Sequence, residues 1–295
     1  MSAAASVDAE RIDAGLVREL LAEQFPHWAG LPVRAVAAGG NDHRMFRLGD
    51  DLSVRLPSAP GYVAQVEKEQ TWLPHLAAAV PLPIPRVHGR GRPSPRFAAP
   101  WSVYGWIPGA PAAHTPIGDL ERFAADLAAF LVALRAAEAA DGPEPGTHSA
   151  HRGGPVGHWD REVRDLLDRV SGRERVLAEG IWRDAVAADA ETGPARWLHG
   201  DVAAANLLVR DGRLAAVVDF GCAAVGDPAC DTVPVWTFLP GPAGSVFRRD
   251  LALDDATWAR GRGWALWKGL IMLTNTAPGQ SDFARRVLSN LFAEA

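Results

Sequence analysis

The tetrapeptide Pro108-Gly109-Ala110-Pro111 divides the chain into two parts with different hydrophobic patterns. Two prolines and a glycine so close together interrupt both helices and central strands. Before this break, short β-prone stretches surround a helical segment, and after it most apolar residues recur with helical spacing. At 295 residues, the chain is long enough for two lobes that each bury a core. We therefore expect an α+β fold with a strand-rich first part and a mainly helical second part.

The first part has the pattern of a small antiparallel sheet packed with helices. Glycine-rich turns separate its short β-prone stretches, which is typical of consecutive strands. Alternating prolines after residue 80 end its second helical segment. The expected elements are an opening helix over Ser6–Phe25, strands over Val33–Ala37, Met45–Leu48 and Leu52–Leu56, a helix over Tyr62–Ala79, and an extended stretch over Ala99–Ile107.

The second part reads as helices interrupted by one compact segment of loops and strands, Trp197–Asp227. A stretch rich in Gly, Pro and His over Asp141–Gly157 predicts a loop. The expected helices are Ile117–Glu138, Trp159–Val170, Ile181–Glu191, Asp254–Leu273 and Ser281–Phe292.

The charge distribution differs between the two parts. The net charge is −5, which argues against nucleic acid as a partner. Residues 1–110 carry +1 and residues 111–295 carry −6. If the second part binds a substrate, this balance favours a cationic one, and the alternative explanation is an acidic, solvated surface, because charge counts mostly report solubility.

Several classes of protein are disfavoured by composition. No run of about 18 apolar residues predicts a membrane span, and the acidic N-terminal residues do not resemble a signal peptide. Cys222 and Cys230 are too few for a disulfide framework or a four-cysteine zinc site. We expect a cytoplasmic protein without a membrane partner.

The segment His199-Gly200-Asp201 carries the strongest chemical signal. Asn206 follows Asp201 by five positions, and a second aspartate, Asp219, ends a later β-prone stretch in Val218-Asp219-Phe220-Gly221. Phosphoryl transfer needs one carboxylate to accept the proton of the attacking hydroxyl and oxygen ligands that hold Mg²⁺ against the phosphates. The three side chains supply these groups, so the segment predicts a kinase-type site.

These motifs resemble those of the aminoglycoside phosphotransferase family, which has H-G-D-x-x-x-x-N, then D-F-G, then G-D-P-x-x-D. The chain supplies the last element as Gly226-Asp227-Pro228-Ala229-Cys230-Asp231. Having His-Gly-Asp in place of His-Arg-Asp points away from protein kinases. The resemblance implies a bilobal, protein-kinase-like fold. It assigns residues 1–101 to a nucleotide-binding N-lobe, 102–109 to a hinge, and 110–295 to a helical C-lobe with the catalytic loop and the acceptor pocket.

The family resemblance also implies roles for single residues. Asp201 would be the catalytic base, and Asn206 and Asp219 would be the Mg²⁺ ligands. His199, Asp227 and Asp231 would support the loop, with Asp231 anchoring it or touching substrate. Two departures stand out: Ala203-Ala204-Ala205 replaces the Pro-Gly pair of many relatives, and Pro234 fits a following helix only near its first turn.

The same resemblance predicts a nucleotide site in the first part. Arg55 would hold the phosphates where kinases have lysine, and Glu69 would pair with it, with Glu67 as the alternative. The nucleotide is ATP or GTP. The remaining residues expected at this site are Gly39, Gly40, Asn41, Asp42 and His43 in a phosphate-covering turn, and Ser102, Val103, Tyr104 and Trp106 at the purine edge.

The acceptor is expected to be a cationic small molecule. Asp160, Glu162 and Glu191 are candidate residues of its pocket, and each fits equally a helix cap or a solvated surface position. The favoured function is transfer of a γ-phosphate to a hydroxyl of an aminoglycoside or a related antibiotic by a monomer or weak homodimer. The alternatives are a kinase of a macrolide, a choline-like compound or a sugar, and a nucleotide-binding pseudokinase that acts as a regulator.

Overall fold

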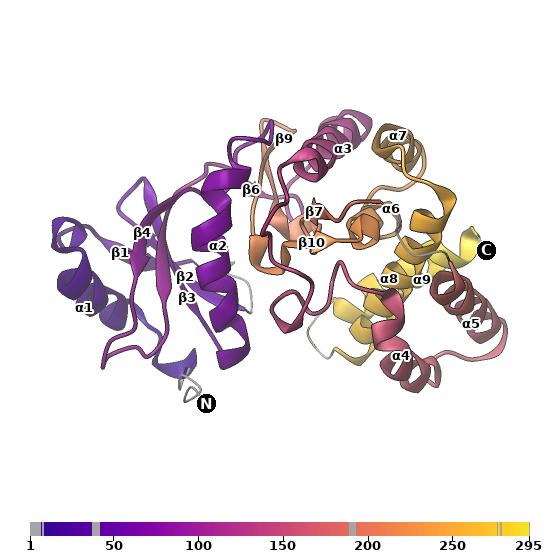
Figure 1. Cartoon of the computed structure of the whole chain (residues 1–295), viewed down its shortest axis with the longest axis horizontal. Coiled ribbons are helices and arrows are strands. Elements are labelled where there is room, and N and C mark those ends of the chain that lie inside the picture. Colours follow the sequence, from indigo (N-terminus) through magenta and orange to yellow (C-terminus); the bar gives the residue numbers. More distant parts are fainter. Residues whose placement is uncertain are drawn as a thin grey trace. The chain divides into compact units, whose positions relative to one another are not determined.

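The computed structural model describes residues 7, 9–36, 42–188, 193–275, 277 and 279–294. The chain forms two compact units (Figure 1). The first comprises Met1–Gly109 and Ala216–Gly221, and the second comprises Ala110–Ala215 and Cys222–Ala295. Each unit therefore has its own core, and the first recruits a short piece of chain from the middle of the second.

The first unit is built on one antiparallel sheet with the order β1-β2-β3-β5-β4. The first three strands are consecutive, which confirms the meander predicted from the glycine-rich turns. Helix α2 (Val63–Leu76) joins the third strand to the fourth. The strands are β1 (Val33–Ala35), β2 (His43–Leu48), β3 (Leu52–Pro57), β4 (Val87–Gly91) and β5 (Trp101–Gly105).

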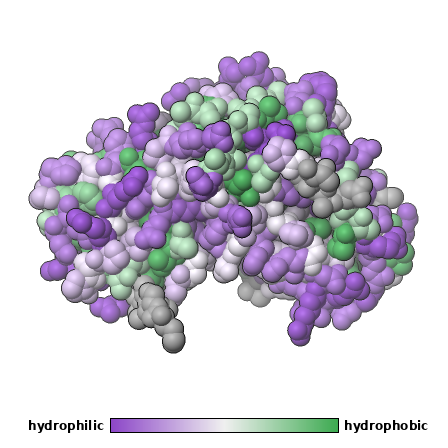
Figure 2. Space-filling model, in the orientation of Figure 1, coloured by the Kyte–Doolittle hydropathy of each residue, from purple (hydrophilic) through white to green (hydrophobic). Residues whose placement is uncertain are grey.

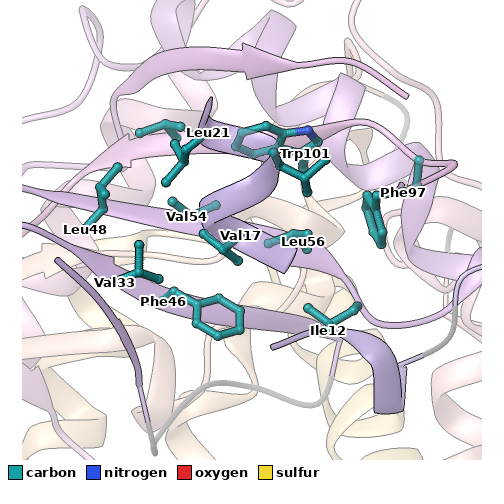
Figure 3. Packing of buried hydrophobic residues seen from close by; sticks show 13 residues of the cluster. Ile12, Val17, Leu21, Val33, Phe46, Leu48, Val54, Leu56, Phe97 and Trp101 are labelled. Carbon is teal, nitrogen blue, oxygen red and sulfur yellow. The ribbon is translucent and has the colours of Figure 1, made fainter. Parts of the chain in front are cut away.

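Helix α1 (Ala14–Gln24) covers the apolar face of this sheet. Val17, Leu20 and Leu21 on the helix are fully buried, and they belong to one cluster with apolar strand residues (Figure 3). The helix is shorter than predicted because Asp13 caps it, accepting a hydrogen bond from the Leu16 backbone N–H at 2.8 Å. The strand residues of the cluster include Phe46, Leu48, Val54, Leu56, Trp101 and Val103.

The opposite face of the sheet is polar because side chains alternate along a strand. Arg55 pairs with Ser102, and Ser53 pairs with Tyr104, in the register between β3 and β5. These side chains therefore share the face opposite the α1 cluster, and α2 contributes the partners of Ser102 and Tyr104, as described below. One sheet thus separates an apolar core from a polar cluster.

The second unit is mainly helical. Helix α3 packs against α7, and α8 packs against both α5 and α9. Helix α7 was not predicted, because Leu239-Pro240-Gly241-Pro242 reads as a turn, whereas Pro242 lies in the first helical turn. The helices are α3 (Leu120–Ala136), α4 (Asp160–Leu167), α5 (Gly172–Ala187), α6 (Pro234–Thr237), α7 (Pro242–Leu251), α8 (Asp255–Thr274) and α9 (Gln280–Ala293).

Short strands flank the sequence motifs of the second unit. β7 (Arg196–Leu198) ends just before the His-Gly-Asp segment and pairs with β10 (Ala224–Gly226). β8 (Leu207–Arg210) lies between β6 (Ala110–Pro111) and β9 (Arg213–Val217). The last two residues of β9 already belong to the first unit.

Polar and charged side chains cover most of the face shown in Figure 2. Within the described ranges, every helix is too short or too polar to cross a bilayer.

Candidate active site

Arg55 is the centre of a charged cluster in the first unit. Its guanidinium lies 3.3 Å from a carboxylate oxygen of Glu69 and 3.0 Å from Oδ1 of Asp219. Tyr104 donates its hydroxyl to Glu69 at 2.6 Å, and Nδ1 of His43 lies 3.3 Å from Nη2 of Arg55. Glu67, the alternative partner, is exposed on the same helix. One guanidinium therefore bridges two carboxylates.

The protonation states in this cluster follow from burial and charge. Burial alone would lower the pKa of Arg55, but Glu69 and Asp219 raise it above its ordinary value, so the guanidinium stays charged. Burial and the Arg55 charge lower the pKa of His43 to about 3. His43 is therefore a neutral imidazole at physiological pH, and it contacts the cation without competing with it.

Asp219 has an uncommon backbone conformation, with φ of +66°. Asp is among the few non-glycine residues that tolerate the left-handed region. Two residues on, the Gly221 carbonyl accepts a hydrogen bond from Lys68 at 2.6 Å. Helix α2 thus fixes the turn that follows Asp219 as well as the guanidinium that contacts it.

Three of the four residues expected at the purine edge, Ser102, Val103 and Tyr104, lie in strand β5. Ser102, Val103 and Tyr104 pair with β3 on one side and β4 on the other, so the ladders use their backbone groups. Val103 is fully buried in the α1 cluster, and Ser102 accepts a hydrogen bond from Gln70 at 2.9 Å. Trp106 follows the strand, and its backbone N–H donates to the Asp51 carbonyl at 2.7 Å.

Asp201 is the centre of a second cluster, in the second unit. Oδ1 lies 3.2 Å from Nζ of Lys268 and 4.0 Å from Nη2 of Arg152. Asn206 donates its amide to both the backbone carbonyl and Oδ2 of Asp201, at 3.0 and 3.1 Å. Partial burial by itself would raise the pKa of Asp201, but Lys268 and then Arg152 hold it well below its ordinary value. The carboxylate is therefore ionised and fixed at both oxygens.

The side chain of Asp231 holds the loop that carries Asp201. The two oxygens of this buried carboxylate accept the backbone N–H groups of His199 and Gly200, each at 2.8 Å. His199 accepts the Asp201 N–H through Nδ1 at 3.2 Å. Gly200 has φ of +81°, and a Cβ there would clash with the Cys222 carbonyl, so only glycine fits.

Asp227 supports the next turn. Its side chain accepts the Ala229 N–H at 3.0 Å and pairs with the buried Arg260 at 2.7 Å. Arg260 belongs to α8, the helix that also carries Lys268. Pro234 lies in the first turn of α6, where its missing N–H is not needed.

A cavity adjoins Asp201 within the second unit. Arg152, Trp264, Trp267 and Lys268 line it, and sequence reasoning identified none of them. One signal was available: Lys68 and Lys268 are the two lysines of the whole sequence, and both contact a motif of the predicted site. The cavity is also lined by Gly200, Asp201, Val202, Cys230 and Val233.

Two of the predicted acidic acceptor residues, Asp160 and Glu162, do not line this cavity. Asp160 accepts hydrogen bonds from Trp182 at 2.8 Å and Arg164 at 2.7 Å, and Glu162 accepts one from the Trp267 indole at 2.7 Å. Both carboxylates begin helix α4. Asp42 accepts the Ser58 N–H through its backbone carbonyl at 2.9 Å. The remaining predicted residues, Gly39, Gly40, Asn41 and Glu191, lie outside the described residues.

Asn206 and Asp219 have the atoms that Mg²⁺ prefers. Asn206 directs Nδ2 to Asp201, so its side-chain carbonyl oxygen is the atom that could bind a metal ion. Asp219 is an ionisable oxygen ligand with 32% of its side chain exposed. No cluster of three or more His, Cys, Asp or Glu residues suited to a metal occurs among the described residues. The donor type of each residue fits Mg²⁺, which is usually held by one or two protein oxygen ligands together with substrate phosphates.

The comparisons with known proteins agree with the motifs. The family model described as the phosphotransferase enzyme family matches residues 33–264. A search of curated proteins gives no match.

Solved structures share the fold over nearly the whole chain. The GDP and kanamycin complex of APH(2")-IIIa has a TM-score of 0.73 at 18% identity, over 94% of this chain and 98% of that one. Macrolide 2'-phosphotransferase MphH from Brachybacterium faecium has 0.62 at 23%, over 95% and 97%. APH(4)-Ia in complex with AMP-PNP and hygromycin B has 0.64 at 21%, over 95% and 97%. These likenesses confirm the predicted kinase-like fold, and the chain belongs to the phosphotransferase enzyme family.

Proposed function

We propose that the enzyme transfers the γ-phosphate of ATP or GTP to a hydroxyl of a small molecule, with Asp201 as the base. The observation that supports this most directly is the setting of Asp201. Its carboxylate is ionised, contacts Asn206 through Oδ2, and stands on a loop fixed by Asp231. A fixed, ionised acceptor is what an attacking hydroxyl needs for orientation and for loss of its proton.

The low pKa of Asp201 is compatible with this role. In a loose transition state, the nucleophile forms little bond to phosphorus before the leaving group departs, so its proton is lost late. Asp201 then serves first to orient the hydroxyl and later to take its proton. Arg55, held by Glu69, is assigned to the nucleotide phosphates.

Mg²⁺ is the proposed cofactor, with Asn206 and Asp219 as its protein ligands. When bound, the ion neutralises charge on the phosphates. We assign nucleotide binding to residues 1–101, the hinge to 102–109, and the acceptor to 110–295. Because ATP and GTP are abundant in the cytoplasm, we assign the enzyme to that compartment, as a monomer or weak homodimer.

Two acceptor classes are candidates from the structural neighbours. One neighbour is described in complex with kanamycin and another with hygromycin B, which supports an aminoglycoside acceptor. MphH is a macrolide phosphotransferase, which supports a macrolide. The nucleotides described in the neighbours include GDP and AMP-PNP, so both bases stay candidates.

The test is nucleotide consumption by the full chain with Mg²⁺ and a panel of aminoglycosides, macrolides, peptide antibiotics, amino alcohols and sugar acids. Asp201→Asn should reduce kcat on the best acceptor by about 10³-fold, while nucleotide Kd stays within about twofold. Asp165→Asn, an exposed position on α4, is the matched control and should retain full activity.

Near-normal turnover by Asp201→Asn would show that Asp201 is not the catalytic base. A wild-type chain that binds nucleotide but phosphorylates nothing in a broad panel would favour the pseudokinase alternative. The presence of Asp201, Asn206 and Asp219 together argues against that alternative, because a regulator needs no proton acceptor.

A further inference from the structure

The cavity beside Asp201 carries an excess of positive charge. Of the described residues that line it, Asp201 is the one carboxylate, whereas Lys268 and Arg152 are two cations. Both cations contact the same oxygen, Oδ1, and 18% of each cationic side chain is exposed. One carboxylate therefore faces two positive groups, and the lining has a local charge of +1.

Arg152 is held in place by contacts other than the one with Asp201. Its Nη1 lies 3.2 Å from Sγ of Cys222, and its guanidinium lies 5.5 Å from the ring centre of Trp267. Trp267 in turn stacks on Trp159 and donates its indole N–H to Glu162. Arg152 is thus positioned before any ligand arrives, which reduces the entropy cost of binding.

The lining offers a further donor. Trp264 is 2% exposed, and its indole Nε1 has no hydrogen-bond partner in the part of the chain that the structure describes. Buried donors without partners are rare in folded proteins. Trp264 is one of the residues that line the cavity, together with Lys268 and Arg152.

We propose that this cavity is a subsite for an anionic oxygen group of the acceptor, a carboxylate or a phosphate close to the hydroxyl that is phosphorylated. The inference rests on the proposed function, because it places the reacting hydroxyl at Asp201. A volume of about 20 Å³ suits one small group, since a single water needs about 10–15 Å³ on this scale. The acceptor is then a hydroxylated acid, such as a sugar acid or a phosphorylated polyol.

The alternative acceptor, a polyamine such as an aminoglycoside, would bring an ammonium next to Lys268 and Arg152. Like charges at such distances disfavour binding, and neither Asp160 nor Glu162 lines the cavity to offset them. A different ligand for the two cations would be the phosphoryl group during its transfer, because it is also negatively charged. The experiment separates these possibilities.

The first arm measures anion binding by the full chain. Malonate or inorganic phosphate, at about ten times its Kd, should raise Tm by about 3 °C, and kanamycin should not. Arg152→Met should weaken this binding at least about tenfold, Lys268→Met should do the same, and Arg152→Lys should restore part of it. Arg161→Met, at an exposed position on α4, is the matched control and should bind the anions as the wild type does.

The second arm measures kcat and KM with glucuronate, glucose and glucosamine, and with every acceptor from the wider panel. The best acceptor should be an acid. Both methionine variants should raise KM for acids about tenfold more than KM for neutral acceptors, whereas any loss of kcat from their contacts with Asp201 should be common to both classes. Equal losses of kcat for acids and neutral compounds, with unchanged KM, would assign the two cations to the transferred phosphoryl group and overturn the inference.

Other results also overturn it: no anion-dependent rise in Tm for the wild type, an equal rise in Arg152→Met, or a polyamine as the best acceptor. In the last case the proposed function stands and the inference fails. A panel without any acceptor counts against the proposed function, and the anion titration still decides the inference.

Discussion

In the first unit one guanidinium, Arg55, lies between two carboxylates, whereas in the second unit one carboxylate, Asp201, lies between an ammonium and a guanidinium. Counting the side chains in direct contact, the first cluster has a charge of −1 and the second +1. The first cluster therefore has one negative charge without a positive partner, and the second has one positive charge without a negative partner.

The difference indicates what each cluster is prepared to bind. Two carboxylates that share one arginine leave one negative charge unpaired. A divalent cation bound at Asp219 would still leave the arginine paired with the other carboxylate. A cation pair that shares one carboxylate can take an anion. Four substitutions test this contrast, in order of decreasing expected effect.

Replacing Asp219 should have the largest effect. Asp219→Asn keeps a residue that tolerates φ of +66°, but it removes the charge assigned to Mg²⁺. We expect Mg²⁺-dependent nucleotide affinity to fall about 100-fold, close to the value that EDTA gives for the wild type. Calorimetric titration with and without Mg²⁺ measures it, and an unchanged metal dependence would contradict the assigned ligand.

The carboxylate below the catalytic loop can be tested by stability. Asp231→Asn leaves one acceptor oxygen for two backbone N–H groups, so the free energy of unfolding should fall by about 1–3 kcal/mol. Asp211→Asn, at a fully exposed turn position, should change it by less than about 0.5 kcal/mol. Urea unfolding of both variants compares them, and equal stabilities would show that Asp231 does not hold the loop.

Changing the charge balance of the first cluster should have a moderate effect. Glu69→Gln leaves Asp219 as the one carboxylate on Arg55, so the arginine competes more strongly with Mg²⁺ for Asp219. Nucleotide affinity should fall about tenfold, which corresponds to about 1.4 kcal/mol. Glu67→Gln, exposed on the same helix, serves as the control. A matching loss in both variants would mean that the helix surface, not the pair, matters.

Tyr104→Phe should have the smallest effect. It removes the hydroxyl that donates to Glu69 at 2.6 Å and leaves the Arg55 contact intact. Stability should fall by about 1 kcal/mol, with nucleotide Kd within about twofold of the wild type. Thermal unfolding and a nucleotide titration measure the two quantities. A large loss of affinity would assign Tyr104 a direct part in nucleotide binding.

The antiparallel sheet and the helical second part were predictable because their signals are local. Strand periodicity and turn glycines lie within a few residues of each other. The functional residues around Asp201 were also predictable, because they lie within one short stretch of the sequence. The pairing of Arg55 with Glu69 followed from the kinase-like arrangement that the resemblance implied.

The surroundings of Asp201 were not predictable for the opposite reason. Arg152 belongs to a Gly- and Pro-rich loop, and Lys268 lies 67 residues beyond Asp201 in a long helix. Only tertiary packing brings them to the same oxygen. The role of Ser102, Val103 and Tyr104 at the purine edge stays a prediction. Their place in a strand paired on both sides was not evident from the sequence, because a β-prone stretch does not reveal whether it will be a central strand or a free hinge.

The scarcity of lysine has a practical consequence for chemical labelling. A reagent that acylates side-chain amines finds two targets in this sequence. Lys68 is 9% exposed, and its ammonium donates to a buried carbonyl, whereas Lys268 reaches a cavity. Mass spectrometry of the acylated chain would therefore report, at a single residue, whether that cavity is occupied.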